Sequence, residues 1–105
     1  MNPDELKNVA WLEPWQPTTP GLEAELEREV GSKHALYGCR AIAVGRRSDC
    51  DDVLFYLPDG PSPLAVVHPT RAGEREENPE SPGTVFYSAL EDWGESRMKR
   101  DHLYR

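Results

Sequence analysis

The chain has 105 residues, with 12 lysines and arginines against 19 aspartates and glutamates, so its formal net charge is −7. This length suits one domain, residues 1–105, and the charge has the wrong sign for binding a nucleic-acid backbone or an anionic membrane surface. No apolar run approaches the roughly 20 residues of a membrane-spanning helix. We therefore expect neither nucleic acid nor membrane among the partners, and no sequence motif indicates a cofactor.

The two cysteines, Cys39 and Cys50, bear on the cellular compartment. The first 25 residues lack the basic start and apolar core of a secretion signal. We therefore expect the reducing cytoplasm and two free thiols, although a disulfide between these neighbouring segments is conceivable. Cys39 is expected to pack as a small buried side chain, whereas the acidic surroundings of Cys50 should raise its pKa.

The two ends of the chain differ in composition from its middle. Residues 20–68 contain 13 of the 20 Leu, Ile, Val and Phe residues, so the core is expected there. Residues 1–19 form an arm rich in proline and tryptophan, and residues 71–83 form an acidic loop without apolar periodicity. Trp11 and Trp15 are candidate partner contacts, because aromatic side chains are frequent at interfaces, and they could equally clamp the arm onto its own sheet.

Residues 20–31 show the pattern of an amphipathic helix. Thr18 or Thr19 can cap its first turn, and Gly31 can end it. One apolar stripe recurs at intervals of four residues: Leu22, Leu26 and Val30. Because the stripe is narrow, one face of this helix should pack and the rest should be solvated.

Three segments rich in β-branched and aromatic residues predict strands, namely residues 35–47, 53–57 and 64–68, and residues 84–87 would add a fourth. The alanines of the first segment would also permit a helix there. Short polar links between the segments favour an antiparallel meander. Small side chains alternate along one face of the first segment, and the helix is placed over them: Cys39, Ala41, Ala43 and Gly45.

Residues 88–101 predict a short C-terminal helix. Ser88 could cap it, with Glu91 three residues further on as a capping box requires, and Gly94 is unfavourable in its interior. The predicted fold is therefore α+β: an antiparallel sheet of three to four strands with an N-terminal helix and a short C-terminal helix. The helical material is expected against one face of the sheet.

Three carboxylates, Asp49, Asp51 and Asp52, stand together before the second predicted strand. Carboxylates suit hard cations such as Mg²⁺ and Ca²⁺, but the residues that follow do not have the EF-hand spacing, and we expect a solvated turn without metal. Asp52 is the exception, because it directly precedes an apolar strand. There it could accept backbone amides, pair with Arg40 or Arg46, or contact a metal ion.

His68 is the one candidate for acid–base chemistry, because it ends a predicted strand beside a proline-bounded loop. Arg71 could then contact an anion, with Arg40 and Asp52 in support. The alternative is that His68 only forms local hydrogen bonds. His34 is expected far from His68, at the opposite end of the meander. No set of nucleophile, base and orienting group is apparent, and no phosphate-binding glycine loop occurs.

The segments HALYG (34–38), DDVLFYL (51–57) and LAVVH (64–68) resemble a group of small bacterial proteins of unknown function. The resemblance covers residues 22–87. It implies no activity and no catalytic residue.

The composition favours a non-catalytic binding module for a basic protein partner, because complementary charge speeds association and rejects wrong partners. Two acidic surfaces are candidates for this contact: the predicted helix with Glu23, Glu25, Glu27 and Glu29, and the loop with Glu74, Glu76, Glu77 and Glu80. The alternative is a small enzyme or ligand-binding protein with its site near His68, using a metal ion held by Asp52. A third interpretation is a domain that associates with its own copy along a sheet edge.

Overall fold

The computed structural model describes residues 3–19, 21–60, 62–68 and 83–104. In chain order its elements are η1 (Pro3–Asn8, a 3-10 helix), β1 (Trp15–Pro17), α1 (Leu22–Glu29), β2 (Ile42–Arg47), β3 (Val53–Tyr56), β4 (Leu64–His68), β5 (Gly83–Tyr87), α2 (Leu90–Trp93), η2 (Gly94–Met98, a π-helix) and α3 (Lys99–Leu103). The prediction of an α+β fold with an antiparallel sheet is confirmed. No helix in these ranges is long and apolar enough to cross a membrane.

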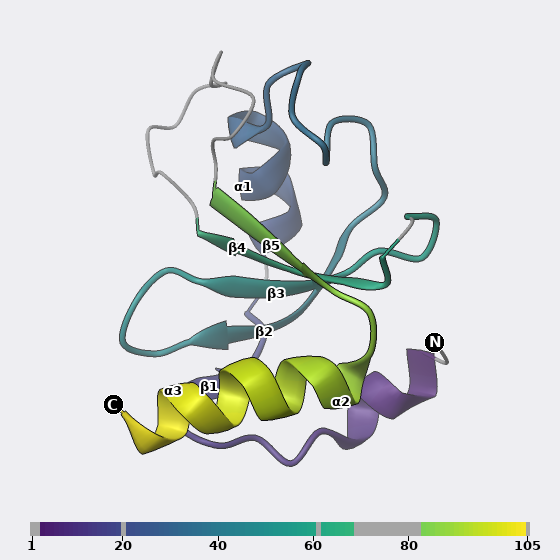
Figure 1. Ribbon diagram of the computed structural model, residues 1–105. Coiled ribbons are helices and arrows are strands. Elements are labelled where there is room, and N and C mark those ends of the chain that lie inside the picture. Colours follow the sequence, from purple (N-terminus) through teal and green to yellow (C-terminus); the bar gives the residue numbers. More distant parts are fainter. Residues whose placement is uncertain (1–2, 20, 61, 69–82, 105) are drawn as a thin grey trace.

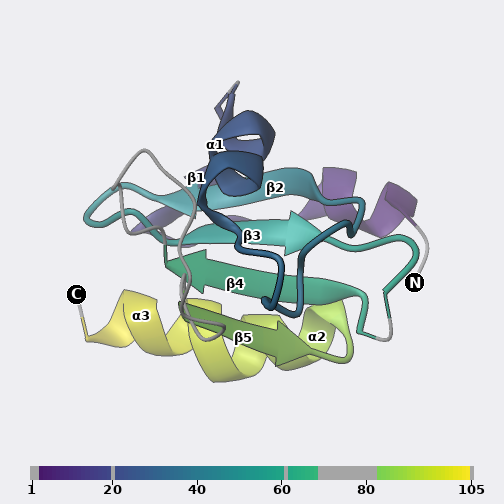
Figure 2. The same cartoon turned by 90° about the horizontal axis from the view of Figure 1, so that it is seen from above.

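The five strands form one antiparallel sheet in the order β1-β2-β3-β4-β5, so each strand pairs with its neighbours in the chain (Figure 2). The prediction of three to four strands misses the strand that the N-terminal arm contributes. In β1, Trp15 lies opposite Arg47 of β2. The prolines of the arm concealed this strand, but a proline is compatible with an edge position, where one side of the strand needs no partner.

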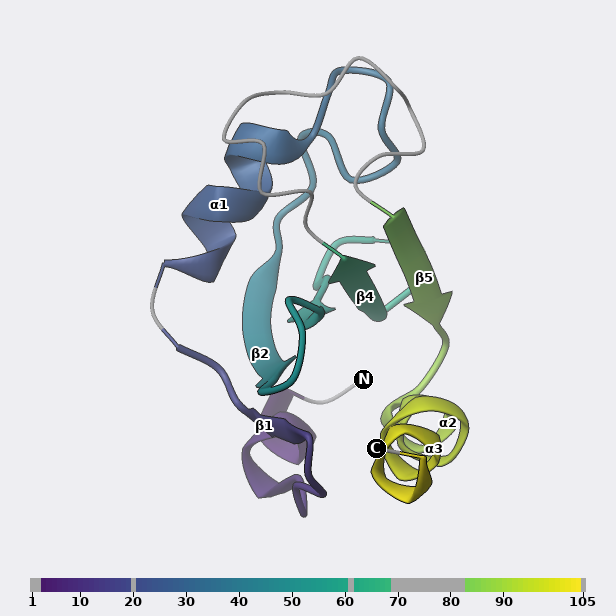
Figure 3. The same ribbon diagram turned by 90° about the vertical axis from the view of Figure 1, so that its left-hand side faces the viewer.

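Helices cover both faces of the sheet (Figures 1 and 3). The α1 helix, which lies within the helix predicted over residues 20–31, covers one face. The consecutive elements α2, η2 and α3 lie against the other. The prediction that helical material covers a single face is therefore wrong. The first element of the chain is only the short 3-10 helix η1, which no sequence pattern indicated.

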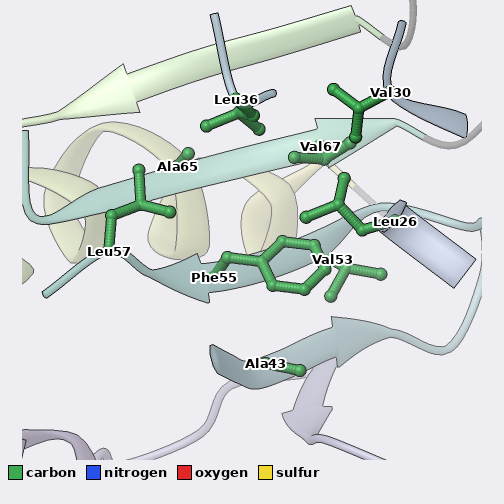
Figure 4. Packing of buried hydrophobic residues seen from close by; sticks show 9 residues of the cluster. All are labelled: Leu26, Val30, Leu36, Ala43, Val53, Phe55, Leu57, Ala65 and Val67. Carbon is green, nitrogen blue, oxygen red and sulfur yellow. The ribbon is translucent and has the colours of Figure 1, made fainter. Parts of the chain in front are cut away.

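The face under α1 has one core cluster, which we call the α1 face (Figure 4). Leu26 and Val30 of the predicted stripe point onto the sheet, where Phe55 and Val67 lie beneath them. The buried members are Leu26, Val30, Leu36, Ala43, Val53, Phe55, Leu57, Ala65 and Val67. Burial of this apolar surface, at about 25 cal/mol per Å², is the main force that holds α1 on the sheet.

The ends of α1 differ from the prediction. Gly21 is the N-cap residue, at φ 92°, and no side chain caps the helix, so neither Thr18 nor Thr19 has that role. Val30 is the C-cap residue in place of Gly31. Glu23 in the first turn reaches the sheet, where its Oε2 accepts a hydrogen bond from the Ala43 amide at 3.1 Å. This bond fixes the start of α1 against β2.

The first predicted strand, residues 35–47, is shorter in the structure because residues 35–38 form turns, residues 39–41 are irregular and β2 begins at Ile42. The register of β2 shifts between Ala43 and Gly45, which is the signature of a β-bulge. The bulge overturns the predicted alternation of small residues. Ala43 faces α1, whereas a Cβ atom on Gly45 would lie 2.3 Å from the Trp11 ring on the other side of the sheet.

The second face has three tryptophans at its centre, and we call it the tryptophan face. Trp15 and Trp93 are 1% and 0% exposed. Their ring centroids lie 5.2 Å apart in a T-shaped contact, and Trp11 makes a similar contact with Trp93 at 6.1 Å. Leu54, Leu64, Val66 and Met98 complete the buried cluster. The arm is thus clamped onto its own sheet, as one of the two alternatives for Trp11 and Trp15 predicted.

The C-terminal helical segment occupies residues 90–103, close to the predicted 88–101. Ala89 is its N-cap residue and no side chain caps it, so the predicted role of Ser88 is wrong. Gly94 adopts helical dihedrals, φ −59° and ψ −44°, and the π-helix begins there.

Replacing Gly45 with alanine should lower the free energy of unfolding by about 1–3 kcal/mol, because the added methyl group would overlap the Trp11 ring and crowd the Gln16 carbonyl. Gly94→Ala is the matched control. Nothing lies within 4 Å of a Cβ atom at Gly94, so this variant should gain about 0.5–1 kcal/mol from helix propensity. Urea denaturation measures both, and equal effects would contradict the packing of Trp11 on Gly45.

Candidate functional site

Two of the predicted site residues, Asp52 and His68, meet at one end of the sheet. Asp52 directly precedes β3 and His68 ends β4, and the pairing of Val53 with Val67 places them opposite one another. His68 Nδ1 lies 2.5 Å from Asp52 Oδ1. The Asp52 side chain is 8% exposed and that of His68 is 67% exposed, so the carboxylate is inside and the imidazole is at the surface.

The second oxygen of Asp52 accepts a hydrogen bond from Arg97 of η2. Arg97 Nε also donates to Asp101 Oδ2 at 2.9 Å, and the same oxygen accepts a hydrogen bond from the Trp15 indole at 2.8 Å. Arg47 at the end of β2 lies 3.3 Å from Asp101 Oδ2. We call Arg47, Asp52, Arg97 and Asp101 the charge cluster. It joins the sheet, the N-terminal arm and the C-terminal helical segment.

The charge cluster keeps both of its arginines protonated. Burial lowers the pKa of Arg97, but hydrogen bonds with Tyr87 and Asp101 outweigh it and the net shift is upward. The hydrogen bond to Asp49 is the largest cause of the raised pKa of Arg47, and the same contact lowers the pKa of Asp49. Two guanidinium groups therefore face two carboxyl groups, and the pairing offsets the cost of taking charge out of water.

The partner of Asp52 is not one that the sequence predicted. Arg40 is exposed in the irregular segment before β2, and Arg46 Nη1 lies 3.4 Å from the Thr19 hydroxyl. Arg97 replaces both, from 45 residues away. The one local signal was the spacing of Arg97 and Asp101, which is the i,i+4 interval of a helical ion pair.

The three neighbouring aspartates do not converge on one point. Asp49 receives two hydrogen bonds of 2.8 Å from the Arg47 guanidinium. Both oxygens of Asp52 have protein partners, His68 and Arg97, so neither is directed at an open coordination site. Among the residues that the structure describes, no three His, Cys, Asp or Glu side chains are grouped as metal ligands.

The prediction that His34 and His68 lie at opposite ends of the sheet is wrong. His34 Nε2 lies 3.3 Å from the Thr84 hydroxyl, and Thr84 pairs with Val67, the neighbour of His68. Both histidines are thus near the same end of the sheet. Side chains alternate between faces along a strand, so His34 lies on the α1 face and His68 on the tryptophan face.

Both cysteines are free thiols. Cys39 is exposed, so the prediction that it packs inside is wrong. Its segment turns away from the sheet before β2 begins. Burial is the largest cause of the raised pKa of Cys50; a hydrogen bond with the Asp52 backbone lowers that pKa, and the negative charges of Asp52 and Asp49 raise it. The predicted direction of that pKa shift is therefore confirmed, with burial as the leading cause.

The predicted acidic surface on α1 has fewer glutamates available to a partner than the sequence suggested. On α1, Glu29 is 1% exposed and Glu23 is bound to β2, which leaves Glu25 and Glu27 of the four. The acidic loop was predicted over residues 71–83. All of it except Gly83 lies outside the described residues, and this includes Arg71, Glu74, Glu76, Glu77 and Glu80.

The last strand, β5, confirms the strand predicted over residues 84–87, but the sequence analysis did not single it out as an edge that could bind a partner. It ends the strand order, so no other described strand pairs with its outer side. Its five residues, Gly-Thr-Val-Phe-Tyr, include no charge and no proline. Val85 is 50% exposed and Phe86 is 40% exposed. Edge strands of this kind are templates for pairing with another chain.

The opposite edge of the sheet is built differently. β1 has only three residues, and its last is Pro17, which has no amide to donate. Short strands and proline are the usual means by which an edge is protected from pairing. The sheet therefore has one protected edge, at β1, and one edge, at β5, that no other strand of the described residues covers; we call the latter the open edge.

No family model, no curated protein and no solved structure matches this chain. The site therefore stands on its own geometry.

Replacing Asp101 with alanine should lower the free energy of unfolding by about 3–5 kcal/mol, because it leaves the Trp15 indole and the Arg97 Nε inside the protein without their shared acceptor. His68→Ala removes only the exposed end of the same chain of contacts and should cost under about 1 kcal/mol. Urea denaturation followed by tryptophan fluorescence measures both losses. A His68→Ala loss as large as that of Asp101→Ala would show that the buried contacts of the charge cluster do not contribute more to stability than its exposed end.

Proposed function

We propose that this protein is a non-catalytic binding module that takes an extended segment of a basic protein partner as an additional strand along β5. The observation that supports this most is the open edge itself, with its exposed Val85 and Phe86 and its lack of charge. Strand addition gains affinity from backbone hydrogen bonds and specificity from pockets for alternate side chains. The reducing cytoplasm is the proposed compartment, in keeping with the two free thiols.

The charge of the chain supports a basic partner. A net charge of −7 attracts a cationic segment from a distance and disfavours an acidic one. It also keeps copies of this chain apart, which argues against pairing of two β5 strands with each other. An extended segment with lysine or arginine at intervals can place apolar side chains against β5 and basic side chains near the negative charge of the protein.

The contact between His68 and Asp52 supports a second candidate, acid–base chemistry at the surface, since a carboxylate that holds Nδ1 leaves Nε2 directed outward. Two observations favour the binding module over it. The Asp52 carboxylate also binds Arg97, which gives it a structural role. Five pockets lined by described residues lie elsewhere, and none of these five includes His68 or Asp52.

The test uses the synthetic peptide Lys-Val-Lys-Val-Lys-Val-Lys, with its Glu-Val counterpart as the charge control. Isotope-labelled protein should show amide shifts centred on β5 with the lysine peptide, and binding should weaken as salt is raised. Val85→Lys should weaken binding about tenfold or more, because it places a charge on the edge.

Ile42→Lys is the matched control, because Ile42 is 37% exposed but lies in β2, an interior strand. Both variants change the net charge equally, so a difference between them isolates the edge. If they weaken binding to the same extent, or if the shifts map to other strands, the proposal fails.

A further inference from the structure

Two pockets lie near the C-terminal end of β5, one at Phe86 and one just beyond the last residue of the strand. One pocket, of about 230 Å³, is lined by Phe86 of β5 together with Leu36, Leu57 and other small or apolar residues. The other, of about 500 Å³, lies where β5 leads into α2 and is lined by Ser88–Glu91 and by Glu5 of η1. We call them the Phe86 pocket and the acidic pocket.

The two pockets are on opposite faces of the sheet. Phe86 pairs with Ala65, and Leu36, Leu57 and Ala65 all belong to the cluster on the α1 face. The acidic pocket is on the tryptophan face, because Leu90 in its wall and Leu6, next to Glu5, pack against the tryptophan cluster. A strand added along β5 would therefore pass between two pockets of different chemistry.

The chemistry of each pocket selects a type of side chain. The Phe86 pocket is walled mainly by carbon and has no charged residue, so it favours an apolar side chain. In the acidic pocket the side chains of Glu5 and Glu91 are exposed, and neither forms an ion pair within the described residues. Two carboxylates in one recess favour lysine or arginine.

Successive side chains of a strand point to opposite faces, so residues at odd separations lie on different faces and residues at even separations share one. We infer that the partner segment has an apolar side chain for the Phe86 pocket and, an odd number of positions away, a lysine or arginine for the acidic pocket. This inference rests on the proposed strand addition along β5. It adds the order in which apolar and basic residues must alternate.

The test compares two peptides of identical composition. Thr-Leu-Ser-Thr-Lys-Ser-Thr has leucine and lysine three positions apart, and Thr-Leu-Ser-Lys-Thr-Ser-Thr has them two positions apart. Nuclear magnetic resonance titration of the full chain measures both dissociation constants. The odd-spaced peptide should bind about tenfold more tightly, because only it can place both side chains in their pockets at once.

Glu91→Gln should remove most of that preference. Glu95→Gln is the matched control, because Glu95 is exposed one turn further along and is paired with Lys99. Equal binding of the two peptides, or a preference that survives Glu91→Gln unchanged, overturns this inference. The Lys-Val peptide separates the two failures: if it still shifts β5, strand addition stands and only the side-chain order is wrong, whereas if it does not, the proposed function fails as well.

Discussion

The hydrogen bonds of Arg97 to Asp52 and Asp101 are the contacts on which the rest of the structure depends. They join the start of β3 to a helical segment 45 residues later in the chain. Asp101 then accepts the indole N–H of Trp15, 86 residues earlier, and this bond holds the arm in place. Both terminal parts of the chain, each poor in aliphatic residues, are thereby fastened over the tryptophan face. Their aromatic side chains supply the burial that their aliphatic content could not.

The way in which these contacts fasten the two ends of the chain also determines which edge of the sheet is left without a neighbouring strand. The arm contributes β1 and protects that edge with a short strand that ends in proline. The C-terminal segment starts directly after β5 and turns beneath the sheet, so it covers a face and leaves the outer side of β5 unpaired by any described strand. The edge proposed for binding is thus a consequence of how the ends of the chain are fastened.

Local sequence patterns predicted the parts of the fold that local interactions determine. The stripe of α1 and the strand at residues 64–68 were found because periodicity and β-propensity report on single elements. Asp52 and His68 were singled out from their positions beside apolar strands, and the structure brings them together. The bulge at Gly45 and the strand in the proline-rich arm were missed, because each depends on what packs against it.

The partner of Asp52 and the open edge could not be predicted either, because both depend on contacts between segments that are distant in the sequence. Arg40 and Arg46 were near in sequence, whereas Arg97 becomes a neighbour only after the C-terminal segment folds back. Whether residues 84–87 form an interior or an edge strand depends on the order of the whole sheet, which residues 84–87 do not encode by themselves.

The most direct test of this account is a double-mutant cycle on Asp52→Asn and Arg97→Met, with unfolding free energies from urea denaturation. If the contact between these two side chains fastens the C-terminal segment to the sheet, the losses should be non-additive, with an interaction energy of about 1–3 kcal/mol. Additivity within about 0.5 kcal/mol would contradict the account, because the two residues would then stabilise the protein independently of each other.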